Sequence, residues 1–250
     1  MMSKALANRL PIIKFWALHN RGMICPHCKS SKISKNGHRR GKQNYICRSC
    51  ERQFVEYYSS VGYSDEIKEQ CLKMYVNGTG FRAIERQTGV NHNTVINWVR
   101  KAAQSLPNAP ESSEIPEITQ VDELETFVGK KNKKWLWTAV NKDYPGILAW
   151  VLGDRSAKTF KQLWQVIKCW HSFFYVTDGY PVYPCFIDDC DHIVKKTYMT
   201  RIEGENTRLR HYLARLHRKT LCYSKSENML IAAIKLLLHY LHYGVVSLPA

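Results

Sequence analysis

A chain of 250 residues is too long for one minimal domain, and with 44% apolar residues it can bury a substantial core. Its net charge of +16 favours a polyanionic partner, usually nucleic acid, although a soluble protein that is merely basic is the plainer alternative. Nine cysteines, four of them in two C-x-x-C pairs, argue against a disulfide framework and for a metal site in a reducing compartment.

Charge divides the chain into regions. Residues 1–103 hold 18 Lys or Arg against 6 Asp or Glu, residues 104–118 hold three Glu and no basic residue, and residues 119–250 hold 19 against 12. Two basic regions therefore flank a short acidic spacer. With the motifs below, this predicts an N-terminal extension over 1–22, a zinc ribbon over 23–58, a helix-turn-helix over 59–103, a linker over 104–118 and a larger domain over 119–250.

The N-terminal extension contains the apolar stretch "LPIIKFWAL". Lys14 interrupts this stretch and no small-residue cleavage site follows it, so we expect no signal peptide. Met23 stands just before the first cysteine, which places residues 1–22 outside the predicted folded unit.

Two cysteine pairs follow, "CPHC" and "CRSC", with 18 residues between them. Each pair places two thiolates on one side of a metal, and two such turns complete a tetrahedral Zn²⁺ site, here formed by Cys25, Cys28, Cys47 and Cys50. A redox dithiol is the main alternative. Many zinc ribbons are purely structural, but basic residues around this one favour contact with phosphates. They are Lys29, Lys32, Lys35, Arg39, Arg40 and Lys42.

Residues 64–103 have helical spacing that is broken at glycines. Ser64 is a candidate N-cap for a first helix with Ile67, Cys71, Leu72 and Tyr75 on its buried side. A short second helix carries Phe81, Ala83 and Ile84, Gly89 makes a turn backed by Val90, and a third helix opens near Asn91 and buries Val95, Trp98 and Val99. This pattern predicts a DNA-reading helix-turn-helix, with an ordinary three-helix unit as the alternative. The candidate DNA contacts on the third helix are His92, Asn93, Thr94, Asn97, Arg100 and Lys101.

Beyond the proline-containing linker the pattern changes to strands. "TQVDELETFVG", "KKWLWTAVNK" and "GILAWVLGD" predict a three-stranded meander, and "SFFYVTDG" predicts a fourth strand. A helix capped by Ser156 is expected between the third and fourth strands. Two more helices are expected at about 203–219 and 226–242. Lys235, His239 and His242 interrupt the most apolar stretch, so we interpret it as a core helix and expect no membrane partner.

Two acids of this region stand out by their surroundings. Asp122 lies within an apolar strand, on the face of Leu124, and Asp178 ends a strand just before Gly179. Carboxylates on neighbouring strands, with a third from a helix, can hold two Mg²⁺ ions for displacement at phosphorus. From these residues alone the group is only a candidate, because Asp188, Asp189 and Asp191 form an equally acidic cluster and a single acid often only caps a turn.

Longer stretches resemble a known family. "VDELETFVGKKNKKWLWTAV", "VLGDRSAKTFKQL", "YVTDGYPVY" and "DHIVKKTYMTRIEGENTRLRHYLARLHRKTLCYSKSENML" are similar to the catalytic part of transposases of the insertion-sequence-one family. The resemblance extends back through the cysteine pairs and "NGTGFRAIERQTGVNHNTVINWV", from about residue 23 to 243. It implies a multidomain α+β protein in which the zinc ribbon and helix-turn-helix recognise terminal inverted repeats. It also implies a ribonuclease-H-like α/β catalytic domain with a mixed sheet.

The same resemblance assigns the catalytic acids. Asp122, Asp178 and Glu203 match the family's Asp-Asp-Glu triad, with 24 residues between the last two, and would bind two Mg²⁺ or Mn²⁺. Glu205 and Glu203 both flank the apolar stripe of their helix, so helical geometry leaves the choice open. The resemblance implies Glu203, and Glu205 then becomes an ion-pair partner of Arg208. Lys195, Lys196, Arg201 and Arg210 are the expected contacts along the DNA path.

The expected function is therefore end cleavage and strand transfer on double-stranded DNA, at the inverted repeats and a target. It would be carried out by a cytoplasmic, nucleoid-associated protein that forms a homo-oligomer in the synaptic complex. One alternative is a DNA-binding regulator with an inactive catalytic remnant. Another is a nuclease of the same fold that cuts without strand transfer.

Overall fold

The computed structural model describes residues 23–58, 62–112, 114–129, 132–217, 220 and 222–248. The predicted extension over 1–22 lies outside these residues. The chain forms two compact units, residues 1–64 and residues 65–250. Among the residues described, no helix combines the length and apolar character that crossing a membrane requires.

The first unit is a small antiparallel sheet in the order β1-β2-β3. Its strands are β1 (Ile33–Arg39), β2 (Lys42–Cys47) and β3 (Gln53–Val55). Arg40 and Gly41 form the two-residue β1–β2 turn, with φ values of 52° and 74°. Such a turn, with both residues left-handed, suits the twist of a hairpin. Cys47 of β2 and Phe54 of β3 form a small buried core with Cys25.

The second unit begins with three helices, α1 (Asp65–Val76), α2 (Phe81–Thr88) and α3 (His92–Ser105). Gly89 adopts a left-handed conformation between α2 and α3, and the Asn91 side chain accepts a hydrogen bond from the backbone N–H of Asn93. The buried residues of α1 include the four predicted ones, whereas Trp98 of α3 is only partly buried. The α+β organisation is confirmed in this form: a small sheet with four cysteines, a helical segment and then a larger sheet.

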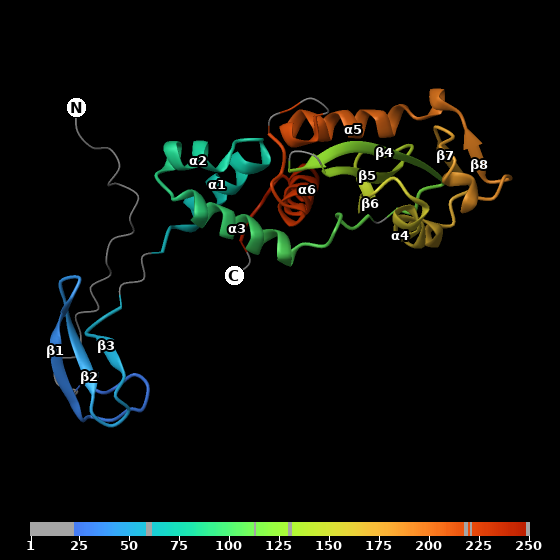
Figure 1. The fold of residues 1–250 in the computed structure, drawn as a ribbon. Coiled ribbons are helices and arrows are strands. Elements are labelled where there is room, and N and C mark those ends of the chain that lie inside the picture. The colour runs from blue at the N-terminus through green and yellow to red at the C-terminus, as the bar shows by residue number, and fades with distance from the viewer. Residues whose placement is uncertain are drawn as a thin grey trace, which may run out of the picture. The chain divides into compact units, whose positions relative to one another are not determined.

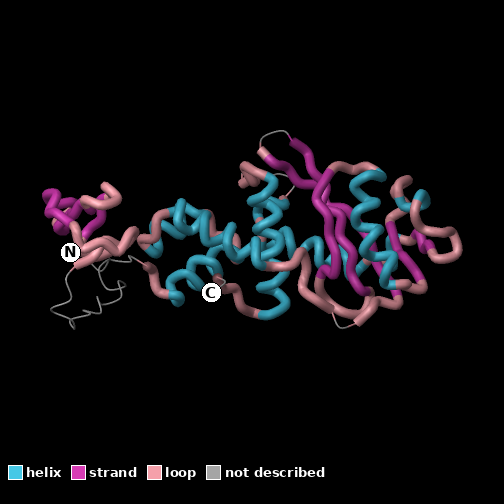
Figure 2. Tube along the Cα trace, turned by 90° about the horizontal axis from the view of Figure 1, so that it is seen from below, coloured by secondary structure: helices cyan, strands magenta, loops and turns pink. Residues whose placement is uncertain are grey.

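A mixed five-stranded sheet follows, in the order β6-β5-β4-β7-β8. Strands β4, β5 and β6 are antiparallel neighbours, as the predicted meander requires, and β7 and β8 run parallel to β4. Figure 1 shows α5 along one side of this sheet and α4 on the opposite side, and Figure 2 shows the strands side by side. The bounds are β4 (Ile118–Val128), β5 (Asn132–Asn141), β6 (Ile147–Gly153), α4 (Ala157–Ile167), β7 (Phe174–Thr177), β8 (His192–Val194), α5 (Thr200–Tyr212) and α6 (Glu227–Tyr243).

The helix predicted over 203–219 differs from the observed one. Helix α5 begins three residues earlier and ends at Tyr212, because Leu213 leaves the helical conformation at φ −112° and ψ 91°. A 3-10 turn at Ala214–Leu216 follows, and residues 218–219 are not described. Leu213 and Leu216 are both buried, so the apolar stripe that predicted one helix is divided between a helix and a turn.

The helical segment α1–α3 packs directly on the rest of the second unit. The Arg215 guanidinium donates to the Tyr75 hydroxyl at 2.8 Å and stacks over its ring. At Gly78, between α1 and α2, a β-carbon would lie 2.8 Å from the backbone oxygen of Tyr212, at the end of α5. Helix α3 also packs against α6. These contacts fix the three helices against the end of α5.

The segment predicted as a linker is held by hydrogen bonds. His239 Nε2 of α6 lies 3.2 Å from the Pro107 carbonyl, and Trp150 Nε1 of β6 donates to the Asn108 carbonyl at 2.7 Å. At its other end the Pro116 carbonyl accepts from Ser172. Between the end of α3 at Ser105 and the start of β4 at Ile118, the described residues have no regular secondary structure, but they are attached to α6, to β6 and to the loop before β7.

Candidate active site and metal centre

The four cysteines of the first unit gather as the sequence predicts. The sulfur atoms of Cys25 and Cys50 lie 3.6 Å apart, those of Cys28 and Cys47 lie 3.5 Å apart, and all four lie within 4.8 Å of one another. A tetrahedral zinc ion with bonds of about 2.3 Å sets its sulfur ligands about 3.8 Å apart. The cluster is therefore consistent with a zinc ion.

Both cysteine turns have the same local structure. Lys29 and Glu51, one residue past each pair, are left-handed, and their N–H groups donate to the carbonyls of Cys25 and Cys47. Backbone N–H groups also favour the thiolate of Cys47. Burial raises the pKa of Cys47, but hydrogen bonds from the N–H groups of Cys50 and Ser49 outweigh it and bring this pKa to about 6. A thiolate is the form that binds metal.

Asp122 lies in β4 of the large sheet, and Asp178 directly follows the neighbouring strand β7. Strand β4 pairs in parallel with β7, with Gln120 opposite Val176. Two residues beyond this pair on each strand, the register places Asp122 next to Asp178, which lies just beyond the end of β7. Asp122 is partly buried and Asp178 is exposed. Glu203 is exposed in the first turn of α5, which packs against β4.

The three acids interact electrostatically. The pKa of Asp122 is raised chiefly by burial and further by the negative charges of Asp178 and Glu203, while hydrogen bonds from the Glu123 N–H and the Asn206 side chain act in the opposite direction. Among the described residues, the cysteines are the only group whose ligand atoms all lie within 4.8 Å, so the three carboxylates are more widely spaced. A divalent cation would relieve their repulsion, and hard carboxylate oxygens are the ligands that Mg²⁺ prefers. The charge and the oxygen ligands of the three acids therefore suit such an ion.

Two buried amides hold α5 to β4 beside Asp122. Asn206 Nδ2 donates to Asp122 Oδ2 at 2.9 Å, and its oxygen accepts from the Thr138 hydroxyl at 3.2 Å, which fixes the amide's orientation. Gln120 accepts from the N–H of Ile202 at 2.9 Å and donates to the carbonyl of Tyr198. The start of α5, where Glu203 lies, is thus attached to the strand that carries Asp122.

Glu205 has a different environment from Glu203. Its side chain is buried, and its Oε1 accepts from the N–H of Gly146, in the β5–β6 loop, at 3.0 Å. The expected ion pair with Arg208 is present at 3.8 Å, longer than the contact to Gly146. One carboxylate oxygen of Glu205 therefore holds a loop in place, whereas Glu203 faces solvent.

A tight turn follows Asp178. Gly179 has φ +86°, and a β-carbon there would lie 2.7 Å from Val194 of β8. The Tyr180 N–H donates to Asp178 Oδ1 at 3.0 Å. The turn thus needs glycine and fixes one oxygen of the Asp178 carboxylate.

The candidate DNA contacts on α3 differ in their surroundings. His92 Nδ1 lies 2.8 Å from Glu85 Oε2, so this ring is engaged with α2. Thr94 is half-buried. The other four predicted residues are exposed: Asn93, Asn97, Arg100 and Lys101.

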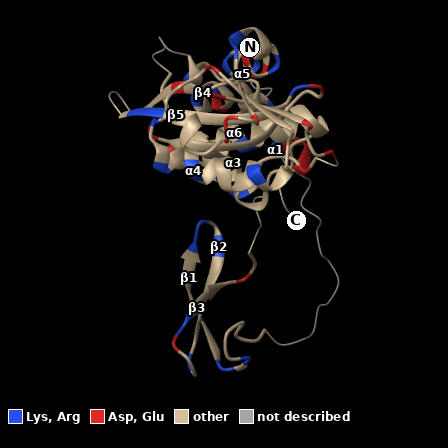
Figure 3. Cartoon of the chain, turned by 90° about the vertical axis from the view of Figure 1, so that its right-hand side faces the viewer, with Lys and Arg blue, Asp and Glu red and all other residues tan. Residues whose placement is uncertain are grey.

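The remaining basic candidates lie in α5 or in the segment just before it. Figure 3 colours all described Lys and Arg residues blue. Lys195 and Lys196 are exposed between β8 and α5, and the Lys195 ammonium lies over the Tyr198 ring. Arg201 Nε donates to the Lys142 carbonyl at 3.3 Å. Arg210 is half-buried, and its carbonyl lies 2.7 Å from His217 Nε2.

Sequence reasoning missed four polar residues at this site: Gln120, Glu123, Arg155 and Asn206. Glu123 is a second acid beside Asp122 in the same apolar strand. Because a buried charge requires a partner, its position indicates that a basic residue lies nearby in the fold. Its partner, Arg155, lies 32 residues away and follows an apolar strand. No spacing rule connects residues that far apart, so only the fold reveals the pair.

Comparison with known proteins places the larger sheet in a family. A family model described as IS1 transposase matches residues 117–244, slightly more than half of the chain. The insertion element IS1 protein InsB of Shigella flexneri is 34% identical over 125 residues, which cover 50% of this chain and 95% of the relative. The insertion element IS1 1 protein InsB of Escherichia coli (strain K12) is 33% identical over 132 residues, or 52% of this chain and 79% of the relative. The chain therefore belongs to the IS1 transposase family.

Proposed function

We propose that this protein binds the terminal inverted repeats of an insertion sequence and catalyses metal-dependent end cleavage and strand transfer. The observation that carries the proposal is the β4–β7 register, which brings Asp122 beside Asp178 at the end of β7, with Glu203 close enough to help raise the pKa of Asp122. The sheet supports it as well. Three antiparallel strands in chain order, extended by two parallel strands next to β4, agree with a ribonuclease-H-like domain.

In this proposal Asp122, Asp178 and Glu203 hold two Mg²⁺ or Mn²⁺ ions. When bound, such ions would activate the water that cleaves the phosphodiester bond at the element's end, and then the freed 3′-hydroxyl that attacks target DNA. Asn206 keeps one oxygen of Asp122 oriented, and the Tyr180 N–H does the same for Asp178. Exposure of Asp178 and Glu203 leaves the site open to a DNA strand.

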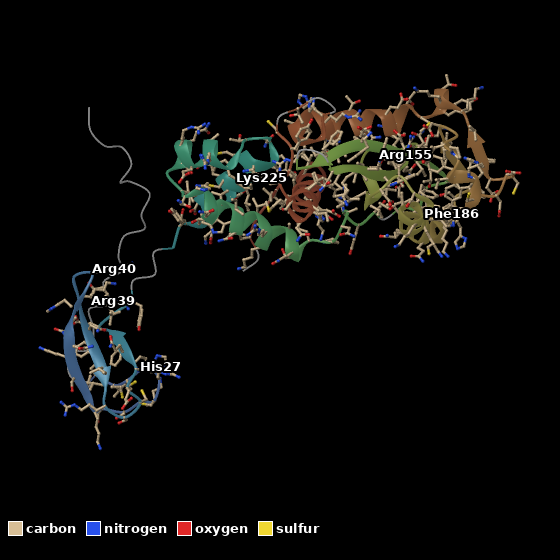
Figure 4. All side chains as sticks on the ribbon, in the orientation of Figure 1. His27, Arg39, Arg40, Arg155, Phe186 and Lys225 are labelled. Carbon is tan, nitrogen blue, oxygen red and sulfur yellow. The ribbon has the colours of Figure 1, made fainter. Side chains whose placement is uncertain are left out.

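DNA recognition is assigned to the N-terminal parts. The exposed Asn93, Asn97 and Arg100 give α3 side chains suited to base edges, which supports a helix-turn-helix with α3 as the reading helix. The first unit would act as a zinc ribbon with a structural zinc ion. Arg39 and Arg40, labelled in Figure 4, lie at the end of the β1–β2 hairpin and would contact phosphates.

Along the DNA path, Lys195 and Lys196 precede the helix that carries Glu203, and Arg201 and Arg210 belong to it. Their charge would hold the backbone of the strand being cut. Because transposition joins two element ends, we propose that the protein works as a homo-oligomer on DNA.

The proposal is tested with DNA that carries the element's own ends, incubated with the protein in Mg²⁺ or EDTA. Asp122→Asn should abolish cleavage while inverted-repeat binding persists, and Asp188→Asn, an exposed acid away from β4, should cleave normally. Cleavage retained by Asp122→Asn would refute the site. Binding without metal-dependent cleavage would indicate a regulator, and cleavage without joined products would indicate a nuclease.

A further inference from the structure

A stacked arginine contacts Tyr180, in the turn that carries Asp178. Arg155, labelled in Figure 4, follows β6 and lies between two aromatic rings. Its guanidinium carbon is 4.5 Å from the ring centre of Trp135 and 3.9 Å from that of Tyr180. Such stacking holds the planar guanidinium in one orientation.

The same guanidinium is paired with a buried carboxylate. Arg155 Nε donates to Glu123 Oε1 at 2.8 Å, and Nη2 contacts the same oxygen. The other oxygen of Glu123 accepts from the Tyr183 hydroxyl at 2.6 Å, and the Glu123 side chain is 2% exposed. Both carboxylate oxygens are therefore occupied, so Glu123, although adjacent to Asp122 in sequence, is committed to Arg155 and Tyr183.

The Asp178 turn is attached to this pair at two points. Tyr180 stacks on Arg155 and its hydroxyl donates to the Arg155 carbonyl at 2.9 Å, while its own N–H donates to Asp178 Oδ1. Three residues further, Tyr183 binds Glu123. Strand β7 ends at Thr177, so Asp178 lies outside the regular strand pairing and depends on the turn for its position.

We propose that Arg155 is a positioning residue that, through Tyr180 and with Glu123, fixes the Asp178 carboxylate for cation binding. This rests on the proposed role of Asp178 as a metal ligand. Residues that orient a ligand in this way typically contribute 10- to 100-fold, as an order of magnitude, to metal affinity or activity. The competing explanation is a buried ion pair that only stabilises the domain.

Metal affinity and stability separate these explanations. Mn²⁺ binding to the full-length chain, without DNA, is titrated by electron paramagnetic resonance, and the melting temperature of each variant is measured in parallel. Arg155→Lys keeps the charge but loses the stacked planar fork, and it should weaken Mn²⁺ binding by about 10-fold or more. Arg215→Lys is the matched control, because Arg215 also stacks on a tyrosine and bonds to its hydroxyl, but away from the acids. It should leave the Mn²⁺ affinity unchanged.

End cleavage provides a second readout. For Arg155→Lys the Mg²⁺ concentration that gives half-maximal cleavage should rise, while the rate at saturating Mg²⁺ recovers toward that of the wild type. Tyr180→Phe, which keeps the ring and loses only the hydroxyl, should shift the Mn²⁺ affinity in the same direction by a few-fold. If Arg155→Lys does not fold, the Mn²⁺ affinity of Tyr180→Phe tests the positioning role instead.

Two outcomes would count against the proposal in distinguishable ways. If Asp178→Asn weakens Mn²⁺ binding but folded Arg155→Lys and Tyr180→Phe bind it like the wild type, the positioning role is wrong and the proposed metal site stands. If Asp178→Asn itself binds Mn²⁺ normally, the proposed metal site is wrong and the positioning role fails with it.

Discussion

Two glutamates separated by one residue differ in what they contact. Glu203 faces solvent near Asp122, and Glu205 is buried against the Gly146 N–H. Glu203→Gln should therefore reduce end cleavage by at least about a hundred-fold, because a metal ligand contributes several kcal/mol to the transition state. The rate is measured on DNA bearing the element's ends.

Glu205→Gln is the control for that variant. Glutamine keeps an oxygen that can accept from Gly146, so cleavage should remain within a few-fold of the wild type. Loss of cleavage in Glu205→Gln with retention in Glu203→Gln would reverse the assignment of the third acid.

The sequence identified individual acids better than it identified their partners. Asp122 was recognisable because a charged residue inside an apolar strand is unusual, and the family resemblance selected Glu203. Helical spacing alone placed Glu203 and Glu205 equally near the core, since the contact that separates them comes from the β5–β6 loop. Spacing along one helix contains no information on that tertiary contact, so it leaves the choice between the two glutamates open.

At the scale of elements, the close approach of the α1–α2 turn to the end of α5 can be tested. Gly78 has φ +87°, and a β-carbon would lie 2.8 Å from the Tyr212 carbonyl oxygen. Gly78→Ala should lower the free energy of unfolding by roughly 1–3 kcal/mol, measured by chemical denaturation. Gly80→Ala, where a β-carbon meets nothing within 4 Å and φ is −72°, should change it much less. Equal effects would show that the approach at Gly78 is unimportant.

Helix α6 adds a pH-dependent contact. Burial lowers the pKa of His239, the nearby charges of His242 and Lys235 lower it further, and the hydrogen bond to Pro107 opposes them. The folded-state pKa therefore lies below the ordinary value of about 6.5. Neutral His239 therefore contributes to the free energy of unfolding. This contribution is fully present above the ordinary pKa of about 6.5 and is lost as the pH falls through the lower folded-state pKa.

The expected result is a melting temperature that falls between pH 7 and pH 5 more steeply in the wild type than in His239→Gln. The glutamine amide can still donate to the Pro107 carbonyl but does not titrate. Identical pH profiles for the two proteins would contradict this account.

Elements with strong local signals were predicted well. The meander β4–β6 follows from β-branched and aromatic runs between turns, and Ser156 caps α4 as expected, accepting from the Thr159 N–H. The end of α5 was not predicted, because Leu213 and Leu216 continue the helical apolar pattern although the backbone leaves the helix. Burial in a turn and burial on a helix face give the same sequence signal there.

At the scale of the whole molecule, the two units should respond differently to loss of zinc. Cys47→Ser removes one of the four proposed zinc ligands, and a metal domain this small typically depends on its ion to fold. We expect the variant to lose its zinc, measured by elemental analysis, and to become protease-sensitive within residues 23–58. A fragment that spans residues 65–250 should remain protected.

Cys185→Ser controls for the loss of a thiol, since Cys185 is exposed and lies outside the cluster. It should keep one zinc per chain and wild-type protease resistance. A zinc content that Cys47→Ser leaves unchanged would exclude the four-cysteine site.

The packing of α1–α3 on the end of α5 constrains how such a transposase can diverge in evolution. Exposed residues of α3, the proposed reading helix, can change without disturbing the contacts of Gly78 and Tyr75. An exchange of the entire helical segment with another transposase must also supply a glycine that fits Tyr212 and a partner for Arg215. New inverted-repeat specificities should therefore arise by point substitution on α3 more readily than by shuffling of modules.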